Sequence, residues 1–415
     1  MPSATKTPGF QNVIIVGAGP AGLLLGLMLS KKGIPVRVLD AAEALDTQPR
    51  ATHYQAPAVH ELNRAGVLEE VQAQGFLPKT VCWRKLDGEV IATLSSEGMD
   101  LPEADKMHCL PLDRLGKILQ SHLLQQKTAK ILWNHKVTGI SQTDEKAFVD
   151  VETPDGPQKL EADYIIGCDG ASSQIRRSLF GDWEFPGRTW DEQIVATNTY
   201  YPFDKFGYKE SNFIIHPEHW HMAAKISNDG LWRVTYGEIP GLTREELLAR
   251  QPEKFKKILP GYSGPDCYKL ASISPYRVHQ RLAKQMVVGR FILAADAAHL
   301  CNPFGGLGLT GGIVDVGGLY DCLVGIYERQ ADPSILARYD EIRREKYTTF
   351  VDPMSTANLR LLFETDPDAA LESSEFLKMC KRAETDRAFA KELQMGIKAL
   401  QHDFTAEYGK AVSLL

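Results

Sequence analysis

Residues 13–22 read VIIVGAGPAG and residues 35–40 read PVRVLD, and these two stretches decide the fold of the N-terminal part. Val13 to Val16 is a short apolar, β-branched run of the kind that forms buried strands. The glycine-rich turn that follows it opens a helical apolar pattern from Leu23 to Lys32, and the second strand ends at Asp40. The order strand, glycine turn, helix and strand indicates a Rossmann-type βαβ unit.

The three glycines of this turn, Gly17, Gly19 and Gly22, have separate physical tasks. The first permits the tight turn, the second lets the backbone approach a pyrophosphate, and the third allows close packing of the helix against the strand. Pro20 and Ala21 open the helix, whose free N–H groups and partial positive charge favour phosphate groups. The turn therefore predicts a phosphate-binding site.

Asp40 completes the pattern of a dinucleotide site. It lies 18 positions after Gly22 (40 − 22), near the spacing of about 20 residues that this fingerprint requires. Its carboxylate is expected to accept hydrogen bonds from the adenosine ribose hydroxyls. The alternative is a glycine-rich turn in some other α/β sheet, but the strand, the helix and the acid together favour dinucleotide binding.

The composition is that of a folded globular protein with a sizeable core. Of the 415 residues, 43% are hydrophobic and 24% are charged, and a length of roughly 150 residues per domain predicts two to three units. The net charge is −6 and basic residues do not gather into a stripe, which argues against nucleic acid as a partner. No uninterrupted apolar run reaches the ~20 residues of a membrane helix, and the N-terminus lacks the apolar core of a signal peptide. We expect a cytoplasmic protein without membrane insertion, acting as a monomer or a homodimer.

The seven cysteines are widely scattered and include no CxxC pair. An odd, dispersed set is typical of reduced thiols rather than of a disulfide framework or a zinc site. His299 and Cys301 have an i, i+2 spacing that metal ligands also use, but no further ligands lie near them in the sequence. We therefore expect no bound metal.

The central part of the chain differs in character from both ends. Ile194–Tyr201, Asn212–His216, His221–Ile226 and Leu231–Glu238 alternate and are rich in aromatic and β-branched residues. They predict an antiparallel sheet, one face of which lines a cavity. A helix is expected over Thr243 to Leu259.

Two further motifs narrow the choice of dinucleotide. Residues 168–176 read CDGASSQIR, a strand, an Asp-Gly turn and a helix, and residues 295–308 read ADAAHLCNPFGGLG. The second literal GxGxxG, which begins at Gly306, does not follow a strand directly, so it is not a second Rossmann site. It instead offers bare backbone at a helix N-terminus for an anion or a flavin edge. Together with the N-terminal fingerprint and Arg50, these motifs resemble the para-hydroxybenzoate hydroxylase family of FAD-dependent aromatic monooxygenases.

The resemblance implies a fold and a domain arrangement. It implies an α/β fold in which a Rossmann-type FAD-binding domain is interleaved with a mainly antiparallel β substrate domain. The FAD-binding domain is expected from residues 1–80, 105–185 and 283–345, the substrate domain from residues 81–104 and 186–282, and a helical C-terminal segment from residues 346–415.

The resemblance also implies roles for individual residues. Asp40 would hold the adenosine ribose, and Asp296 the ribityl chain or the pyrophosphate. Asp169 and Gly170 would serve both the FAD pyrophosphate and NAD(P)H. The cofactor-binding residues expected in all are Gly17, Gly19, Pro20, Ala21, Gly22, Asp40, Arg50, Arg114, Asp169, Gly170, Asp296, Pro303, Gly306, Leu307, Gly308 and Leu309.

This sequence departs from the family pattern at a few positions. The glycine that usually precedes the ribityl-binding Asp is Ala295, and the usual Met-Asn after the last glycine pair is Leu309-Thr310. The backbone logic of the motifs is nevertheless intact.

The activity implied is an NAD(P)H- and O2-dependent hydroxylation of an aromatic, phenolic small molecule through a flavin C4a-hydroperoxide, with FAD as cofactor and NADPH or NADH as reductant. The aromatic-rich pocket strands favour a sizeable apolar phenol, as in secondary metabolism. Alternatives on the same fold are a flavin epoxidase or Baeyer–Villiger-type oxygenase, an FAD-dependent reductase, or a flavin redox sensor.

A phenolic substrate reacts faster as its phenolate, so a base or a hydrogen-bond acceptor near its hydroxyl is expected. The candidates on the predicted cavity strands are Tyr200, His219, His221, Arg233 and Tyr236. Arg233, Tyr236 and His219 are taken as the catalytic residues, because the strand of the first two resembles the family strand whose arginine interacts with the flavin and whose tyrosine faces the substrate.

Overall fold

The computed structural model describes residues 9–48 and 50–409 and is organised by two large sheets. The first is built on the N-terminal βαβ unit, and its strands run parallel except for the terminal pair β17–β18. Its order is β17 (Val287–Val288), β18 (Phe291–Leu293), β11 (Tyr164–Gly167), β1 (Val13–Val16), β2 (Val36–Leu39) and β7 (Ala129–Leu132). The side chains of β1 and β11 are buried throughout, as expected for a parallel sheet that is covered on both faces.

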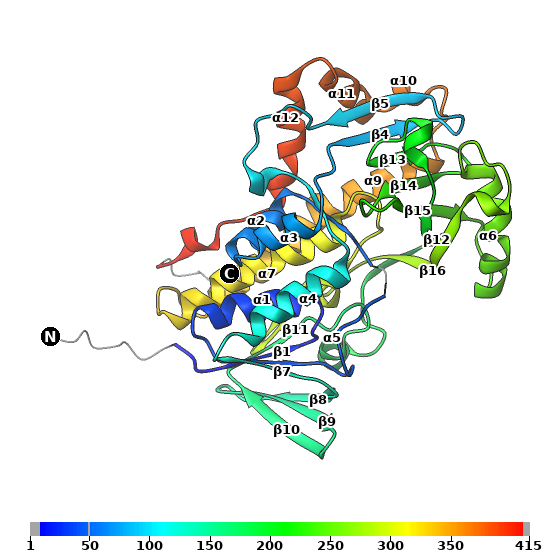
Figure 1. Cartoon of the computed structure of the whole chain (residues 1–415). Coiled ribbons are helices and arrows are strands. Elements are labelled where there is room, and N and C mark those ends of the chain that lie inside the picture. Colours follow the sequence, from blue (N-terminus) through cyan, green and yellow to red (C-terminus); the bar gives the residue numbers. More distant parts are fainter. Residues whose placement is uncertain (1–8, 49, 410–415) are drawn as a thin grey trace.

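Helices cover one face of this sheet and a small antiparallel sheet covers the other (Figure 1). The helical layer contains α1 (Pro20–Lys31), α4 (Leu112–Leu124), α7 (Leu307–Tyr327), α2 (Ala56–Arg64) and α3 (Leu68–Gln74). The small sheet contains β8 (Lys136–Gln142), β9 (Ala147–Thr153) and β10 (Gly156–Ala162), and α5 (Gln174–Phe180) packs beside it. A two-stranded ladder of β3 (His53–Tyr54) and β6 (His108–Cys109) lies apart from both large sheets.

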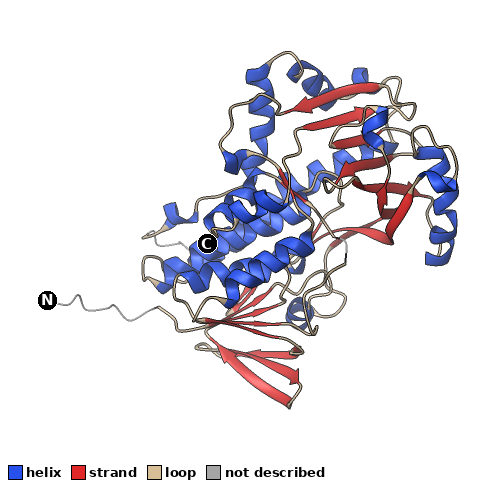
Figure 2. Cartoon of the chain, in the orientation of Figure 1, coloured by secondary structure: helices blue, strands red, loops and turns tan. Residues whose placement is uncertain are grey.

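The second large sheet is mainly antiparallel. Its order is β19 (His299–Leu300), β16 (Lys269–Leu282), β12 (Gly187–Tyr200), β15 (Leu231–Glu238), β14 (His221–Lys225), β13 (Ser211–Ile214), β4 (Thr80–Arg84) and β5 (Val90–Ser95). Helix α6 (Arg244–Ile258) covers one face, beginning at a capping box in which Thr243 and Glu246 bond each other's backbone N–H. Figure 2 shows these strands in red with α6 along their flank.

The C-terminal part is helical. It contains α8 (Ile335–Lys346), a π-helical turn (Tyr347–Val351), α9 (Asp352–Phe363), α10 (Ala370–Ser373), α11 (Glu375–Ala383) and α12 (Arg387–Met395). Short 3-10 helices lie at Glu103–Asp105, Phe203–Phe206, Pro265–Cys267, Ala295–Ala297, Gly396–Leu400 and Phe404–Glu407. Helix α11 packs against β5, so this part of the chain returns to the second sheet (Figure 1).

The fold class predicted from the sequence is confirmed. Helices α2 and α3 are separate, because Gly66 between them adopts a left-handed φ of +71°. The domain boundaries stay a prediction, and their parts at residues 1–8, 49 and 410–415 lie outside the described residues.

Helix α7 is long and apolar enough to cross a membrane, but 89% of its apolar window is buried inside the protein. It packs against α1, α2 and α8. Its composition is therefore that of a core helix.

Candidate functional site

One large cavity lies where the carboxyl ends of the parallel strands meet the second sheet. Its volume is about 1560 Å3, and ligands of open α/β sheets bind at this edge of the strands. The C-terminal helices close its far side. The predicted cofactor-binding residues that line it are Gly19, Pro20, Ala21, Arg50, Gly170, Asp296, Pro303, Gly306, Leu307, Gly308 and Leu309.

The N-terminal glycine turn has the shape that the sequence predicts. A Cβ on Gly17 would lie 2.4 Å from the carbonyl oxygen of Cys168, and one on Gly22 would lie 1.9 Å from the carbonyl oxygen of Gly17. A Cβ on Gly19, in contrast, would meet no heavy atom of the described residues within 4 Å. Gly17 and Gly22 are thus required by packing, whereas Gly19 leaves open space on the cavity side.

Helix α1 points its N-terminus into this open space. Gly19 is its N-cap and supplies no side chain, Pro20 stands at the first helical position, and the first turn carries no acidic residue. The uncapped N–H groups and the helix dipole therefore favour an anion at this end.

Asp40 lies beside the turn at the end of β2. One of its carboxylate oxygens accepts a hydrogen bond from Ala18 N–H at 2.6 Å, and the other accepts from Ala42 N–H at 2.8 Å. Each oxygen retains a second lone pair. The carboxylate is therefore oriented by the turn and still able to accept from ribose hydroxyls.

Asp169 lies at the end of β11, between Cys168 and Gly170, and caps helix α5. Its carboxylate accepts hydrogen bonds from the N–H groups of Gln174 at 2.7 Å and Ile175 at 3.2 Å, so it stabilises the start of α5. Burial raises the pKa of the Asp169 carboxyl. Among the described residues, Gly170 faces the cavity and Asp169 does not.

Ala295 and Asp296 form the second turn of the site. Ala295 has a left-handed φ of +56°, which side chains other than glycine rarely adopt. Asp296 exposes its carboxylate to the cavity while protein surrounds it, and burial raises its pKa, opposed in part by His299 and Arg50. This turn therefore presents the Asp296 carboxylate to the cavity at the carboxyl end of β18, where a ligand can contact it.

The glycine-rich loop from Pro303 to Leu309 leads into α7. Gly305 and Gly306 have φ values of +121° and +67°. Gly306 is the N-cap of α7 and supplies no side chain, and the first turn of the helix carries no acidic residue. The loop therefore presents bare backbone and a second uncapped helix start to the cavity.

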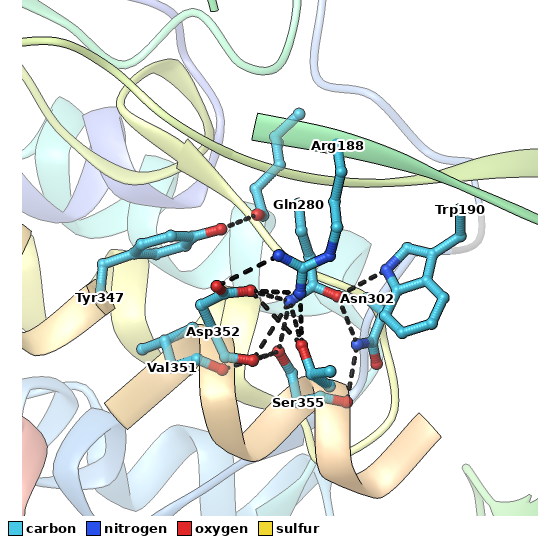
Figure 3. A network of polar contacts seen from close by, with 10 residues as sticks. Arg188, Trp190, Gln280, Asn302, Tyr347, Val351, Asp352 and Ser355 are labelled. Atoms are coloured by element: carbon cyan, nitrogen blue, oxygen red, sulfur yellow. Dashed lines mark hydrogen bonds and ion pairs between the residues drawn. The ribbon is translucent and has the colours of Figure 1, made fainter. Parts of the chain in front are cut away.

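A buried polar network anchors this loop to the second sheet and to α9, as Figure 3 shows. Gln280 accepts hydrogen bonds from the indole of Trp190 at 2.6 Å and from the amide of Asn302 at 3.0 Å. The Gln280 amide donates to the Ser355 hydroxyl at 3.2 Å, and Asn302 donates to the Ser355 carbonyl at 2.7 Å. Arg188 joins the network through an ion pair with the carboxylate of Asp352 at 2.8 Å. Asn302, next to the loop, is thereby held by two separate elements, β16 and α9.

The two predicted arginines lie in different surroundings. Arg50 lines the cavity and pairs with Asp46 at 3.1 Å, both side chains being largely exposed. Arg114 is exposed and lines a smaller neighbouring cavity of about 200 Å3. Of the two, Arg50 is the one the structure brings to the large cavity.

On β15, the side chains alternate and only one face reaches the cavity. Arg233 and Thr235 line it. Tyr236 is fully buried on the opposite face, where its ring contacts Phe255 of α6 at 6.1 Å between centroids. The prediction that Tyr236 faces the substrate is therefore wrong, since residues three apart on a regular strand cannot share a face.

The predicted histidines and Tyr200 also lie away from the cavity. His219 precedes β14 instead of belonging to it, and its ring stacks on His216. His221 pairs in register with Tyr236 and is buried on the same far face. Tyr200 donates to the carboxylate of Asp229 at 3.3 Å near the surface. The structure therefore does not support His219 as a group that touches the substrate.

Several cavity residues are not among the site residues predicted above. His53 lines the cavity, its Nδ1 lies 2.8 Å from the Thr52 hydroxyl, and burial together with Arg233 lowers its pKa to about 4, so the ring is neutral. Tyr276 on β16 also lines the cavity, and burial raises its pKa. Strand alternation relative to Arg233 would have found Thr235, and His53 follows closely after Arg50 in the sequence, but no sequence pattern points to Tyr276. The apolar lining beside them comes from Trp83, Phe213, Met222 and Ala224.

These features fit FAD. The cavity has a bare turn where a pyrophosphate can approach, two uncapped helix starts for its charge, and the carboxylate of Asp296, while the carboxylate of Asp40 lies beside the turn at the end of β2. The same cavity extends along the second sheet, where Trp83, Phe213 and Met222 line it and could contact a ring-shaped substrate.

Comparison with known proteins agrees with this geometry. The family model described as "FAD binding domain" matches residues 11–353. The chain is 36% identical over 394 residues to the para-nitrophenol 4-monooxygenase of Pseudomonas sp. (strain WBC-3), covering 94% of this chain and 96% of that protein. It is 37% identical over 361 residues to the 6-hydroxy-3-succinoylpyridine 3-monooxygenase of Pseudomonas putida, covering 86% of this chain and 90% of that protein.

A solved structure gives the same result. The crystal structure of the p-nitrophenol 4-monooxygenase PnpA from Pseudomonas putida superposes with a TM-score of 0.88 at 34% identity, covering 95% of this chain and 99% of that one. The flavin-dependent monooxygenase PieE, solved with FAD and substrate, has a TM-score of 0.75 at 19% identity and supports the fold alone.

Proposed function

This chain belongs to the FAD-dependent aromatic monooxygenases, and we propose that its substrate is a single-ring phenol or hydroxypyridine that carries a second substituent para to the hydroxyl group. The enzyme is a flavoprotein that uses FAD with NAD(P)H and O2. The proposal concerns the class of ring it accepts and the carbon it oxygenates.

Two relatives with similar sequence identity to this chain are named for the ring carbon that they oxygenate, and these positions support the proposal. The name para-nitrophenol 4-monooxygenase places the reaction at ring carbon 4, which bears the nitro group. The name 6-hydroxy-3-succinoylpyridine 3-monooxygenase places it at carbon 3, which bears the succinoyl group and lies para to the hydroxyl. In both rings, oxygen goes to the substituted carbon opposite the hydroxyl. We propose the same regiochemistry for this chain.

The chemistry of such a ring has a definite outcome. A hydroxyl group makes the para carbon electron-rich, and bound FAD supplies the oxygen atom, taken from O2 at the expense of NAD(P)H. Since the substituted carbon has no hydrogen to lose, the substituent leaves instead. For p-nitrophenol, oxygen adds at carbon 4 and the C–N bond breaks, which gives p-benzoquinone and nitrite, with one NAD(P)H oxidised and the second oxygen atom released as water.

The single-ring substrate is preferred to a large secondary metabolite on grounds of similarity. The relatives at 36% and 37% identity are named for single-ring compounds. Neighbours from the biosynthesis of pyrroindomycins and rebeccamycin share only 20–21% identity. Those neighbours support the fold and not the substrate.

Arg233 is proposed to hold the oxygen of the substrate hydroxyl. It lines the cavity, and its one hydrogen bond within the described chain goes from Nε to the neutral side chain of Asn198 at 2.9 Å. No carboxylate lies within ion-pair distance of it in residues 9–48 and 50–409. A surrounded cation without a counter-ion favours an anionic ligand. His53 and Tyr276, which interact with it electrostatically, are neutral and do not offset its charge.

The roles of the remaining residues follow from their positions. The turn Gly17–Gly22 and Arg50 would hold the pyrophosphate, Asp40 the adenosine ribose, Asp296 the ribityl chain, and the loop Pro303–Leu309 the flavin ring. Trp83, Phe213 and Met222 exclude water from the substrate region. Asp169 would act on FAD indirectly, by stabilising the start of α5. The Arg114 side chain would need to change its orientation to reach FAD. We also propose that the enzyme acts in the cytoplasm without nucleic-acid or membrane partners, as a monomer or homodimer.

The test is turnover of FAD-loaded protein with NADPH or NADH on matched phenols. p-Nitrophenol, p-cresol, m-nitrophenol and phenol are compared by NAD(P)H oxidation, nitrite release and mass spectrometry of products. We expect p-nitrophenol to release one nitrite per NAD(P)H and to exceed m-nitrophenol by at least about 10-fold in kcat/KM, a difference of one well-placed contact.

Hydroxylation of phenol or m-nitrophenol beside the hydroxyl, without nitrite, would contradict the proposed regiochemistry while leaving the monooxygenase activity intact. NAD(P)H oxidation that yields only hydrogen peroxide with every single-ring compound would contradict the substrate class.

A further inference from the structure

A fully buried carboxylate, Asp315, lies behind the turn that carries Asp296. It belongs to α7 and accepts hydrogen bonds from His299 Nε2 at 2.7 Å and from Arg343 Nε at 2.6 Å. It also accepts from the backbone N–H of Ala295 at 3.0 Å. All three donors therefore converge on one carboxylate that does not itself reach the cavity.

The backbone group that Asp315 holds belongs to a residue in an unfavourable conformation. Ala295 has a φ of +56°, a left-handed conformation that residues with a Cβ rarely adopt. The helix opposite makes room for it, because a Cβ on Gly312 would lie 2.7 Å from the Cβ of Ala295. The residue after it is Asp296. The conformation of Ala295 thus sets the direction in which the Asp296 carboxylate enters the cavity.

The remaining contacts tie this turn to the C-terminal part. Arg343 on α8 donates a second hydrogen bond from Nη1 to the Leu400 carbonyl at 2.6 Å. The ring of Tyr347 packs against His299 at 5.3 Å between centroids, and its hydroxyl donates to the Leu300 carbonyl at 2.7 Å. The direction of Asp296 therefore depends on residues that lie up to 105 positions away in sequence (400 − 295).

A buried ion pair is weak evidence for a purely stabilising role, because the loss of solvation offsets much of the attraction. Helix α7 offers a matched case in Asp321, which is also buried and pairs with Arg64. Asp321 has no contact with the Ala295 turn among its hydrogen bonds, and the cavity lining does not include it. Asp315 and Asp321 are therefore both buried carboxylates paired with an arginine, and they differ in that Asp315 also bonds the turn that carries Asp296.

We propose that Asp315 is a positioning residue for FAD binding, which holds Ala295 N–H and, with His299 and Arg343, fixes the turn that aims Asp296 at the cofactor. The proposal rests on the proposed role of Asp296 toward FAD.

Equilibrium binding of FAD to the full chain tests it, followed by flavin fluorescence and absorption, with the thermal midpoint of the FAD-free chain measured in parallel. Asp315→Asn is compared with Asp321→Asn on the same helix and with Asp296→Ala. We expect Asp315→Asn to raise the Kd of FAD at least about 10-fold and to shift the flavin absorption band. The reason is that Asp315 orients the Asp296 carboxylate through the backbone of Ala295, and the variant loses this orientation. Asp321→Asn should lower the thermal midpoint but change the Kd less than about twofold.

The possible outcomes distinguish a failure of the proposed role of Asp315 from a failure of the proposed role of Asp296. If Asp296→Ala binds FAD as the wild type does, the premise about Asp296 fails. If Asp296→Ala weakens binding but Asp315→Asn leaves the Kd within twofold, or if both helix variants weaken it equally, the inference fails. Should Asp315→Asn not fold, His299→Leu removes one donor and keeps the Arg343 ion pair, and it must then raise the Kd at least about threefold. None of these readouts involves a phenol, so they do not depend on the substrate proposed above.

Discussion

The two turns that face the cavity, Gly17–Gly22 and Ala295–Leu309, are held in their shapes in different ways. In the first, backbone packs against backbone, and side chains are excluded by the carbonyl groups of Gly17 and Cys168. In the second, buried side chains hold the chain from behind, with Asp315 bonded to Ala295 and Gln280 bonded to Asn302. The first turn is a local structure, whereas the second depends on residues brought together by the fold.

The two turns should therefore respond differently to substitution. In the first, a single methyl group added to a tightly packed glycine is expected to disrupt the turn. In the second, removal of a distant hydrogen-bond partner should be as damaging as a change in the turn itself.

The largest effect is expected for Gly22→Ala. Its Cβ would lie 1.9 Å from the carbonyl oxygen of Gly17, so strand and helix must separate. We expect loss of FAD binding together with a lower thermal midpoint of the FAD-free chain. Gly19→Ala is the matched variant, because its Cβ meets nothing within 4 Å. It should fold normally and lose only FAD affinity, and a fall in the thermal midpoint as large as that of Gly22→Ala would show that packing does not distinguish the two glycines.

A smaller but clear effect is expected for Gln280→Leu behind the second turn. The substitution leaves Trp190 and Asn302 without their acceptor in a buried place, and each such loss costs about 1–3 kcal/mol. The free energy of unfolding should fall, and the Kd of FAD should rise on the order of 10-fold. Urea titration and flavin fluorescence measure the two quantities.

Gln193→Leu is the control for that variant. Gln193 is also buried and bonds both backbone groups of Leu242, but it does not line the cavity. It should lose stability without a change in FAD affinity. Equal effects of both variants on the Kd would mean that the network of Figure 3 has no special connection to the flavin loop.

Local rules explain why the sequence predicted the first turn and much of the fold. Gly17, Gly19, Gly22 and Asp40 lie within one βαβ unit, and their spacing alone identifies the site. Thr243 and Glu246 likewise predict the start of α6 from four residues. Each of these features depends on neighbours in sequence.

The sequence located the second turn and the substrate region, but it did not predict which residues support the turn or which residues line the region. The motif at residue 296 identified the loop, yet its support comes from Arg343 and Gln280, which no local pattern connects to it. Tyr236 was misplaced for a different reason, because the family resemblance assigned both it and Arg233 to the cavity, although alternation puts residues three apart on opposite faces of the strand. His219 was misplaced because β14 begins at His221.

Acid titration gives a narrower test of the second turn. His299 and Arg343 lower the pKa of the buried Asp315 to about 2, against the opposing effect of burial. A depressed pKa in the folded protein means that the stabilisation is present above the ordinary carboxyl value of about 3.9 and is lost as the pH falls through about 2. The difference in stability between wild type and Asp315→Asn should be constant above about pH 5 and shrink between about pH 4 and 2. A difference that stays constant down to pH 2 would contradict this assignment.

The smallest effect is expected for Tyr236→Phe, which tests the alternation rule in β15. The Tyr236 hydroxyl is buried on the α6 side and has no hydrogen-bond partner within the described residues. We expect kcat and KM to change less than about twofold, as for a substitution that removes no contact. A loss of 10-fold or more in kcat/KM would place the tyrosine in the reaction after all.

Turnover of p-nitrophenol under 18O2 is the decisive measurement of whether this chain acts as an FAD-dependent aromatic monooxygenase. We expect one labelled oxygen to enter each ring, with one NAD(P)H consumed and one nitrite released per product. An unlabelled product, or labelled hydrogen peroxide as the sole oxygen-derived product across all phenols, would contradict this expectation.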